Sequence, residues 1–291
     1  MNEIVILDGA RTAIGTFGGM LAGTSPIELA TVVSKAALER SGVEGAQIGQ
    51  VAFGHVINTE PKDMYLSRVA ALQAGVSETT AAMNVNRLCG SGAQAIVSVI
   101  QSLMLGDADF GLAGGAENMS RSPFILQDQR WGAKMGDVRT LDMMLGALNC
   151  PFGTGHMGVT AENVAEEHDI SRAQQDAFAM TSQTRAAAAI REGRFEDQIT
   201  PVLVKVKRDK VDFICDEHPK QTDEAALAGL RPVFQKDGSV TAGNASGIND
   251  GAAALVLAQA SAAQMAGLRP RARGAASSSD SLDAPQAARQ N

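Results

Sequence analysis

The residue best placed for chemistry is Cys89, within residues 86–92 (NRLCGSG). This run lies between an apolar segment that favours a strand and a long apolar segment that favours a helix. At the start of a helix, free backbone N–H groups and the helix dipole favour a thiolate over a thiol. The flanking glycines allow a substrate carbonyl to approach closely. The pattern predicts a nucleophilic cysteine, and the alternative is a small buried hydrophobic residue, which is the fate of most single cysteines.

The elements around Cys89 alternate between strands and helices. Ser25, Pro26 and Glu28 form a helix start with a capping box, and Gly42 ends that helix. Short apolar runs predict strands at 4–8, 50–57, 82–86 and 109–113, and helical spacing predicts further helices at 64–74 and 91–105. This β-α order predicts an α/β fold with a mostly parallel sheet covered by helices. Because segment 91–105 is apolar nearly all round, we expect it to be buried.

The later part of the chain is less regular. Residues 118–250 form an expected inserted loop domain, and residues 1–117 plus 251–270 form the domain that contains Cys89. Inside the insertion, a capping box at Ser171 starts a helix of about 22 residues. The last segment, 271–291, holds one Leu and no Val, Ile, Phe or Met. Such a segment has too little apolar surface to order itself, so we expect it to be disordered.

Composition limits the class of protein. The 291 residues are 45% hydrophobic and 20% charged, which is typical of a globular chain. The net charge of −7 argues against nucleic acid as the main partner. Three cysteines are too few, and odd in number, for a disulfide scaffold. No run of 18 apolar residues and no signal-like start is present, so we expect no membrane span and a cytoplasmic location.

Six short motifs resemble the thiolase family, and they follow in the order expected for it. They are residues 9–15 (GARTAIG), 85–103 around Cys89, 114–120 (GGAENMS), 156–163 (HMGVTAEN), 230–234 (LRPVF) and 241–247 (TAGNASG). Thiolases are acyl-CoA C-acyltransferases that make or cleave 3-ketoacyl-CoA. The motifs are most similar to those of bacterial biosynthetic thiolases, which condense acetyl-CoA with acetyl-CoA or with a short acyl-CoA.

The resemblance implies a role for each matching residue. Cys89 matches the cysteine that takes the acyl group, and CoA or acyl-CoA is a substrate, with no permanently bound cofactor and no metal. The implied substrate-binding residues are His156 and Met157 at the CoA and acyl pocket, Ser246 near the pantetheine, Phe234, Ala242 and Gly243 as pocket walls, and Lys220 near a CoA phosphate.

Each of these residues has a simpler alternative. A lone histidine such as His156 is more often a satisfied loop residue than a ligand contact. Ser246 lies in a run rich in Gly and Asn, where a serine often serves only the turn. Lys220 is as well explained by a solvated surface charge as by a phosphate contact. Cys150 and Cys215 have no matching motif and are expected to be structural.

The resemblance also implies segments that this sequence does not contain. Thiolases consist of two similar α/β halves, with the loop domain inserted in the first, and they form dimers or tetramers. Their second half carries a Gly-His-Pro segment, an Asn-Glu-Ala-Phe-like segment and a Cys-x-Gly segment. Here the only His-Pro pair is His218-Pro219, which follows Glu217, and no cysteine follows Cys215. We therefore expect the first half with its loop domain, no second half, and a segment 271–291 that is not native family sequence.

Two functions of different classes follow. The first is a thiolase-type acyltransferase whose full cycle is impaired, because the residues that move protons in the family lie in the second half. The second is a non-catalytic fragment that binds acyl-CoA or pairs with thiolase subunits as part of a homo-oligomer. A third reading, a ketoacyl synthase, is disfavoured by the His-Met-Gly motif at 156–158.

Overall fold

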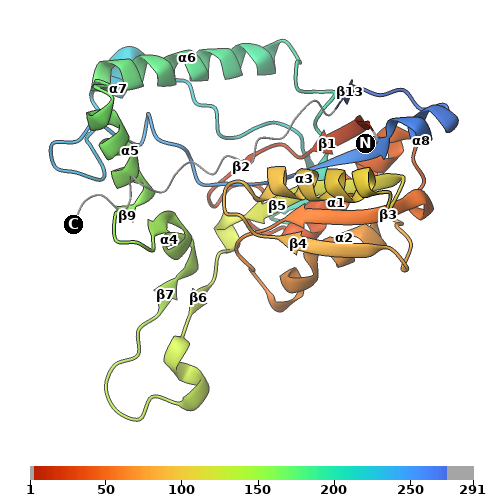
Figure 1. The fold of residues 1–291 in the computed structure, drawn as a ribbon. Helices are drawn as coiled ribbons and strands as arrows, with labels where there is room; N and C mark the ends of the chain where they lie inside the picture. Colours follow the sequence, from red (N-terminus) through yellow and green to blue (C-terminus); the bar gives the residue numbers. More distant parts are fainter. Residues whose placement is uncertain (1–2, 274–291) are drawn as a thin grey trace. The chain divides into compact units, whose positions relative to one another are not determined.

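The computed structural model describes residues 3–273, and their contacts divide them into two compact units (Figure 1). Unit 1 holds the described residues up to Ser122, then Glu196–Glu217, and the described residues from Asn249. Unit 2 holds Pro123–Phe195 and His218–Ile248. Segment 196–217, which the sequence places in the loop domain, thus clusters with unit 1. The predicted domain boundaries themselves remain a prediction.

Unit 1 is built on one mixed sheet. Its strands are β1 (Ile4–Arg11), β2 (Gly15–Thr16), β3 (Ile48–Gly54), β4 (Ala81–Val85), β5 (Phe110–Asn118), β12 (Asn249–Gln259) and β13 (Ala272–Arg273). The order is β13-β1-β12-β5-β3-β4, with β2 also on β12. β4 and β5 pair in parallel with β3, whereas β12 is antiparallel to both β1 and β5. The α/β class is confirmed, but the sheet is less parallel than expected, because the chain leaves at the end of β5 and returns beside it as β12.

Helices cover both faces of this sheet. They are α1 (Pro26–Ser41), α2 (Leu66–Gln73), α3 (Ser91–Leu105), α8 (Ala260–Met265) and the short 3-10 turns Gly45–Gln47, Pro61–Tyr65 and Met119–Arg121. Val51 and Phe53 of β3 pack with α1 and α2, whereas Ala52, between them, packs with α3. Because side chains alternate across a strand, α3 lies on the opposite face from α1 and α2 (Figure 1).

The expected burial of α3 is wrong for most of the helix. Its buried residues are Ser91, Ala95, Val99 and Leu103, one per turn, so a single stripe packs on the sheet. Leu105 is 80% exposed, and Ile96, Ile100 and Met104 are only partly buried beside this stripe. Leu88–Leu105 is long and apolar enough to cross a membrane by length and composition, a test that core helices also pass. Of this window 22% is buried, through the stripe that packs on the sheet.

A hairpin and an edge strand complete unit 1. Strands β10 (Val202–Val206) and β11 (Asp209–Phe213) pair with each other, and Val202, Val204 and Phe213 join the core on the α1 face. Ala272 and Arg273 pair with β1, so the segment expected to be disordered from residue 271 begins as an edge strand. The rest of that segment, 274–291, lies outside the described residues.

Unit 2 consists of short strand pairs and helices. Its elements are β6 (Phe124–Ile125), β7 (Leu141–Asp142), β8 (Asn149–Cys150), β9 (Gly155–His156), α4 (Met143–Leu148), α5 (Met157–Glu167), α6 (Arg172–Arg191), α7 (Glu224–Ala228) and the 3-10 turn Gln127–Trp131. Helix α6 begins at the predicted capping box of Ser171 and Gln174. It has 20 residues, close to the predicted length.

Candidate active site

Cys89 lies on a tight turn between β4 and α3. Leu88 has a left-handed backbone with φ of 47°, which is uncommon for a residue other than glycine. Asn86 supports this turn, since its Oδ1 accepts a hydrogen bond from the Leu88 N–H at 3.1 Å. The Ser91 hydroxyl accepts from the Arg87 N–H at 2.9 Å and donates to the Leu88 carbonyl. The turn is therefore held by its own polar side chains on both sides of Cys89.

The surroundings of Cys89 suit a reactive thiol. Cys89 is exposed, which removes the alternative of a small buried hydrophobic residue. It precedes Gly90, the N-cap of α3, and no side chain there accepts from the first amides of the helix. Free N–H groups at a helix start stabilise a nearby negative charge. Cys89 is therefore exposed at a helix start, and its catalytic role remains a prediction.

In unit 2, the structure brings together two of the predicted pocket residues. The rings of His156 and Phe234 stack with centroids 4.8 Å apart and planes 17° apart. His156 is the N-cap of α5, and its Nδ1 accepts a hydrogen bond from the Gly158 N–H at 3.0 Å. Because Nδ1 accepts this bond, the proton of the neutral ring is on Nε2. Gly158 is required beside the ring, since a Cβ there would lie 2.2 Å from Phe234.

The other predicted pocket residues lie on unit 2 with fewer contacts. Met157, next to His156, is 42% exposed. Ala242 and Ser246 are exposed, and the Ser246 hydroxyl makes only a long contact of 3.4 Å to the Gly247 carbonyl. Gly243 packs against Leu227 and Leu230, where a Cβ would be closer than 3 Å to each side chain. Lys220 is exposed, and its backbone N–H donates to Gln183.

Glu162 is a buried anchor of unit 2 to which sequence analysis assigned no role. Its carboxylate accepts hydrogen bonds from the N–H groups of Ser239 and Val240 and from the Ser239 hydroxyl, at 2.8–3.0 Å. Burial raises the pKa of Glu162, but the hydrogen bonds from Ser239 and Val240 outweigh it, and the net pKa is lowered. The side chain thus fixes the irregular segment at 239–240 that leads into 241–247.

Replacing Glu162 by glutamine tests this anchor. The amide keeps one acceptor oxygen but turns an NH₂ group towards backbone donors. We expect the variant to lose about 1–3 kcal/mol of stability. Hydrogen exchange at Ser239 and Val240 measures the effect, with Glu166→Gln on the same helix as an exposed control. Unchanged protection of those two amides would contradict the assigned anchor.

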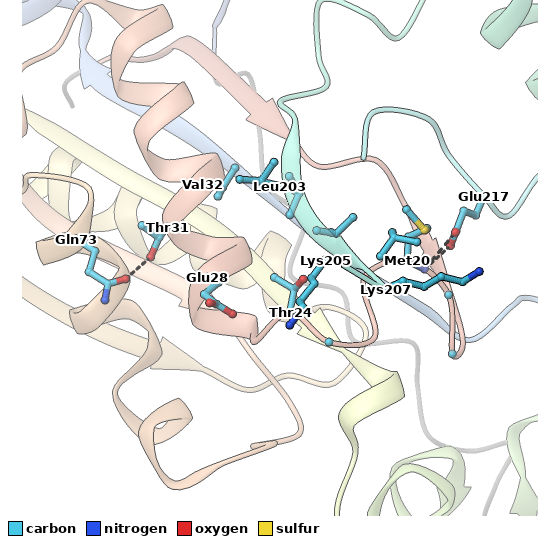
Figure 2. Close-up of a pocket in the computed structure, with 16 residues that line it drawn as sticks. Met20, Thr24, Glu28, Thr31, Val32, Gln73, Leu203, Lys205, Lys207 and Glu217 are labelled. Carbon is cyan, nitrogen blue, oxygen red and sulfur yellow. Dashed lines mark hydrogen bonds between the residues drawn. The ribbon is translucent and has the colours of Figure 1, made fainter. Parts of the chain in front are cut away.

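Two other features fall outside the predicted site. Hydrogen bonds from the backbone of Phe152 and the side chain of Thr154 lower the pKa of Cys150, a signal that the sequence did not contain. A cleft of about 860 Å³ lies in unit 1 between α1, the loop 18–24 and β10 (Figure 2). Glu217 in this cleft is already bound to the N–H groups of Thr16 and Met20. None of the predicted site residues lines the cleft.

A family model described as the N-terminal domain of thiolase matches residues 4–261. The chain belongs to the thiolase family. It is 55% identical over 274 residues to the beta-ketothiolase BktB of Cupriavidus necator, and the match covers 94% of this chain and 70% of that relative. It is also 45% identical to an acetyl-CoA acetyltransferase of Escherichia coli, covering 94% of this chain and 70% of the relative.

The fold of this chain is also similar to solved thiolase structures. The acetyl-CoA acetyltransferase of Bacillus anthracis superposes with a TM-score of 0.90 at 43% identity, covering 93% of this chain and 68% of that one. Human mitochondrial 3-ketoacyl-CoA thiolase in complex with CoA superposes with a TM-score of 0.89 at 37% identity, and the match covers 94% of this chain and 68% of the human one. The predicted family and fold are confirmed, and the chain corresponds to the N-terminal part of the thiolase fold. Its relatives are acetyltransferase and ketothiolase enzymes, of whose length it spans about 70%.

Proposed function

We propose that this chain carries the acyl-accepting part of a thiolase-type acyl-CoA C-acyltransferase. The Cys89 thiolate attacks the thioester carbonyl of an acyl-CoA, the bond between that carbonyl carbon and the CoA sulfur breaks, and CoA leaves as a thiolate that takes up a proton. The observation that carries the proposal is an exposed cysteine on a strained turn at an uncapped helix start. Its neighbours in sequence match the family's nucleophile motif.

The substrate-binding roles are proposals of the same kind. The stacked His156 and Phe234 support a wall of the CoA and acyl pocket, with Met157 next to His156. Ala242, Gly243 and Ser246 continue that wall along 241–247, and Lys220 is an exposed cation suited to a CoA phosphate. The human thiolase bound to CoA supports acyl-CoA as the substrate class. No permanently bound cofactor is part of this proposal.

The full condensation needs more than residues 1–291 supply. It requires a base for the α-carbon of the second acetyl-CoA and donors for two developing oxyanions. In the family, the resemblance implies that a Cys-x-Gly cysteine moves the α-proton, a Gly-His-Pro histidine activates the nucleophile and an Asn-Glu-Ala-Phe-like segment helps form an oxyanion hole, and none of these segments occurs in this sequence. Loss of one proton-transfer group typically slows a reaction about 10²–10⁴-fold. We therefore propose acylation without efficient turnover.

Incubation with acetyl-CoA tests the first step. We expect a mass increase of one acetyl group in the wild-type chain, located at Cys89 by peptide mapping, and none at that position in Cys89→Ala. Thiolysis of acetoacetyl-CoA is expected to be near background for both proteins. Equal labelling of the wild type and Cys89→Ala would refute the role of Cys89. Rapid thiolysis that depends on Cys89 would refute the proposed loss of turnover.

A second candidate, a non-catalytic subunit-pairing fragment, is favoured by exposed apolar surface. Besides α3, the unit 2 residues Trp131 and Met135 are 87% and 97% exposed. Contiguous exposed apolar patches mark association surfaces. Co-elution with a full-length thiolase, in a sample that acetyl-CoA does not label, would support this candidate over the first. Both candidates are compatible with homo-oligomers.

A further inference from the structure

Three ionisable side chains meet where β3 and β5 end in unit 1. His55 directly follows β3, Glu117 is near the end of β5, and Asp63 lies in the 3-10 turn Pro61–Tyr65. The His55 Nε2 atom is 3.9 Å from Asp63 Oδ2, and its Nδ1 is 3.6 Å from Glu117 Oε1 and 2.8 Å from the Ala116 carbonyl. The side chains of His55 and Asp63 are 1% and 0% exposed. His55 and Asp63 therefore lie beneath the surface, and Glu117 is partly buried with 28% of its side chain exposed, at the sheet edge that also carries Cys89.

Each carboxylate of the cluster holds backbone. Glu117 accepts hydrogen bonds from the N–H groups of Val56 and Ile57 at 2.9 and 3.1 Å. Asp63 Oδ2 accepts from the Thr59 N–H and hydroxyl and from the Glu60 N–H. Within the described residues, His55 Nε2 and Asp63 Oδ1 have no hydrogen-bond partner. Segment 55–60 is thus fixed by the buried Asp63 and the partly buried Glu117 rather than by regular secondary structure.

The fixed segment contacts the turn that carries Cys89. The His55 N–H donates to the Val85 carbonyl at 3.0 Å, where β4 ends. The Val56 carbonyl is 3.5 Å from the Asn86 amide nitrogen, and the other end of that amide accepts from the Leu88 N–H. A continuous series of contacts therefore runs from Glu117 through residues 55–56 to Asn86 and to the left-handed Leu88. Left-handed backbone at leucine persists only where its surroundings impose it.

We propose that Glu117 is a positioning residue for Cys89, which acts by holding residues 55–57 so that Asn86 keeps the strained turn at Leu88. The inference rests on the proposed role of Cys89 in acyl transfer. Glu117 does not reach the reacting atoms and exchanges no proton with them. Its effect is on the geometry of the thiol, so it is measurable without acyl-CoA.

The probe is 4,4′-dipyridyl disulfide, which reacts with thiolates and releases one 4-thiopyridone per cysteine. The measured quantity is the rate at Cys89 divided by the rate at Cys215, an exposed cysteine on another segment, resolved by peptide mass analysis. In Glu117→Gln, one backbone N–H loses its acceptor, and we expect this ratio to fall on the order of tenfold. Asn86→Ala, at an exposed position that tolerates truncation, is expected to give a similar fall. An unchanged ratio in Asn86→Ala, or in folded Glu117→Gln, would overturn the proposal.

Two further variants separate positioning from general loosening. Asp250 is a matched control, because burial also raises the pKa of this carboxyl, yet it binds Ser120 instead of residues 55–57. We expect Asp250→Asn to leave the ratio unchanged. Asparagine tolerates left-handed backbone better than leucine, so Leu88→Asn in the Glu117→Gln background is expected to recover most of the loss. The proposal would be overturned if the rate ratio were as low in the Glu117→Gln/Leu88→Asn double variant as in Glu117→Gln alone. An equal fall of the ratio in Asp250→Asn would also overturn it.

The pH profile gives a readout that a purely structural role would not change. Burial raises the pKa of Glu117 above its usual 4.5, against the opposing effects of His55 and of the Ile57 and Val56 N–H groups, while Asp63 adds to the rise. As the pH falls through this raised pKa, the carboxylate gains a proton and holds the two N–H groups less strongly. The wild-type ratio should fall there, the Glu117→Gln ratio should be low and flat, and Asp250→Asn should retain the wild-type profile. A fall that persists in Glu117→Gln would contradict the assignment.

The disulfide assay and the acetylation assay distinguish failure of this inference from failure of the proposed function on which it rests. If Cys89 takes no acetyl group but the disulfide ratio responds as expected, the acyl-transfer proposal fails and the positioning role stands. If Cys89 is acetylated but the ratio is indifferent to Glu117 and Asn86, the positioning role fails alone.

Discussion

Replacing Gly54 by alanine is expected to destabilise unit 1 strongly and to displace the turn that carries Cys89. A Cβ at Gly54 would lie 2.4 Å from the Ser91 carbonyl carbon and 2.5 Å from the Gly92 nitrogen. Both atoms belong to the backbone of the first turn of α3, so no side-chain rotation relieves the clash. Overpacking of this kind typically lowers stability by about 1–3 kcal/mol, and we expect the upper end. Thermal unfolding should show a fall of about 6–12 °C.

Gly92 provides the matched control for Gly54. It lies in the same contact, one residue into α3, but a Cβ built on it meets no atom within 4 Å. Alanine is favoured over glycine within helices by up to about 1 kcal/mol. We therefore expect Gly92→Ala to unfold at the same temperature as the wild type or above it. If Gly54→Ala also unfolds at the wild-type temperature, the close approach of β3 and α3 is not a constraint on the fold.

Replacing Asp216 by alanine is expected to destabilise unit 1 by a similar amount. Its carboxylate oxygens bind the two terminal nitrogens of Arg11 at 2.8 and 3.0 Å, and Oδ1 also accepts from the Ile14 N–H at 2.7 Å. These bonds join the end of β1 to the chain that follows the β10–β11 hairpin. The side chains of Arg11 and Asp216 are mostly buried. Removing the Asp216 carboxylate therefore leaves the Arg11 charge and the Ile14 N–H group without their acceptor. We expect a loss of about 2–4 kcal/mol in chemical denaturation.

The pH dependence of Asp216 follows from its pKa. Burial raises this pKa, but the hydrogen bonds and charge of Arg11, with the Ile14 N–H, lower it below the usual 3.8. A carboxyl with a lower pKa in the folded state stabilises the fold above the unfolded pKa, and this contribution is lost as the pH falls through the folded value. The stability difference between wild type and Asp216→Ala should therefore be full near neutral pH and shrink below about pH 3.8. Asp216→Asn keeps an acceptor for the Ile14 N–H, so its stability should lie between that of the wild type and that of Asp216→Ala. A difference that grows on acidification would contradict the assigned ion pair.

Local features of the fold were predictable because they depend on neighbours in sequence. The capping box of Ser25 and Glu28 and the left-handed Gly42 bound α1 as expected. Ser171 and Gln174 likewise start α6. Capping joins groups three residues apart, so the sequence contains the whole interaction. The mixed pairing of the sheet was not predictable in this way, since β12 pairs with β5 across an inserted segment of more than one hundred residues.

In the candidate site, too, local features were predictable from the sequence and long-range contacts were not. The position of Cys89 at the start of α3 was evident from strand, glycine and helix patterns in residues 82–105. The left-handed Leu88 was not, because leucine carries no preference for that backbone and the constraint comes from Asn86 and Ser91. The roles of Glu162 and Glu117 also went unassigned, although both lie in quoted motifs. Their partners are 77–78 and 60–61 residues away in the chain.

The sequence by itself determined the family, the α/β class, the helix starts and the cysteine proposed as nucleophile. These depend on residue type and short spacing, which the chain carries whatever its tertiary structure. Only the tertiary structure decided that α3 buries one stripe, that His156 stacks on Phe234, and that the buried Glu162 and Asp63 and the partly buried Glu117 fix loop segments. Burial and long-range hydrogen bonds depend on which segments meet, because a carboxylate is an anchor only where unpaired backbone N–H groups are brought to it.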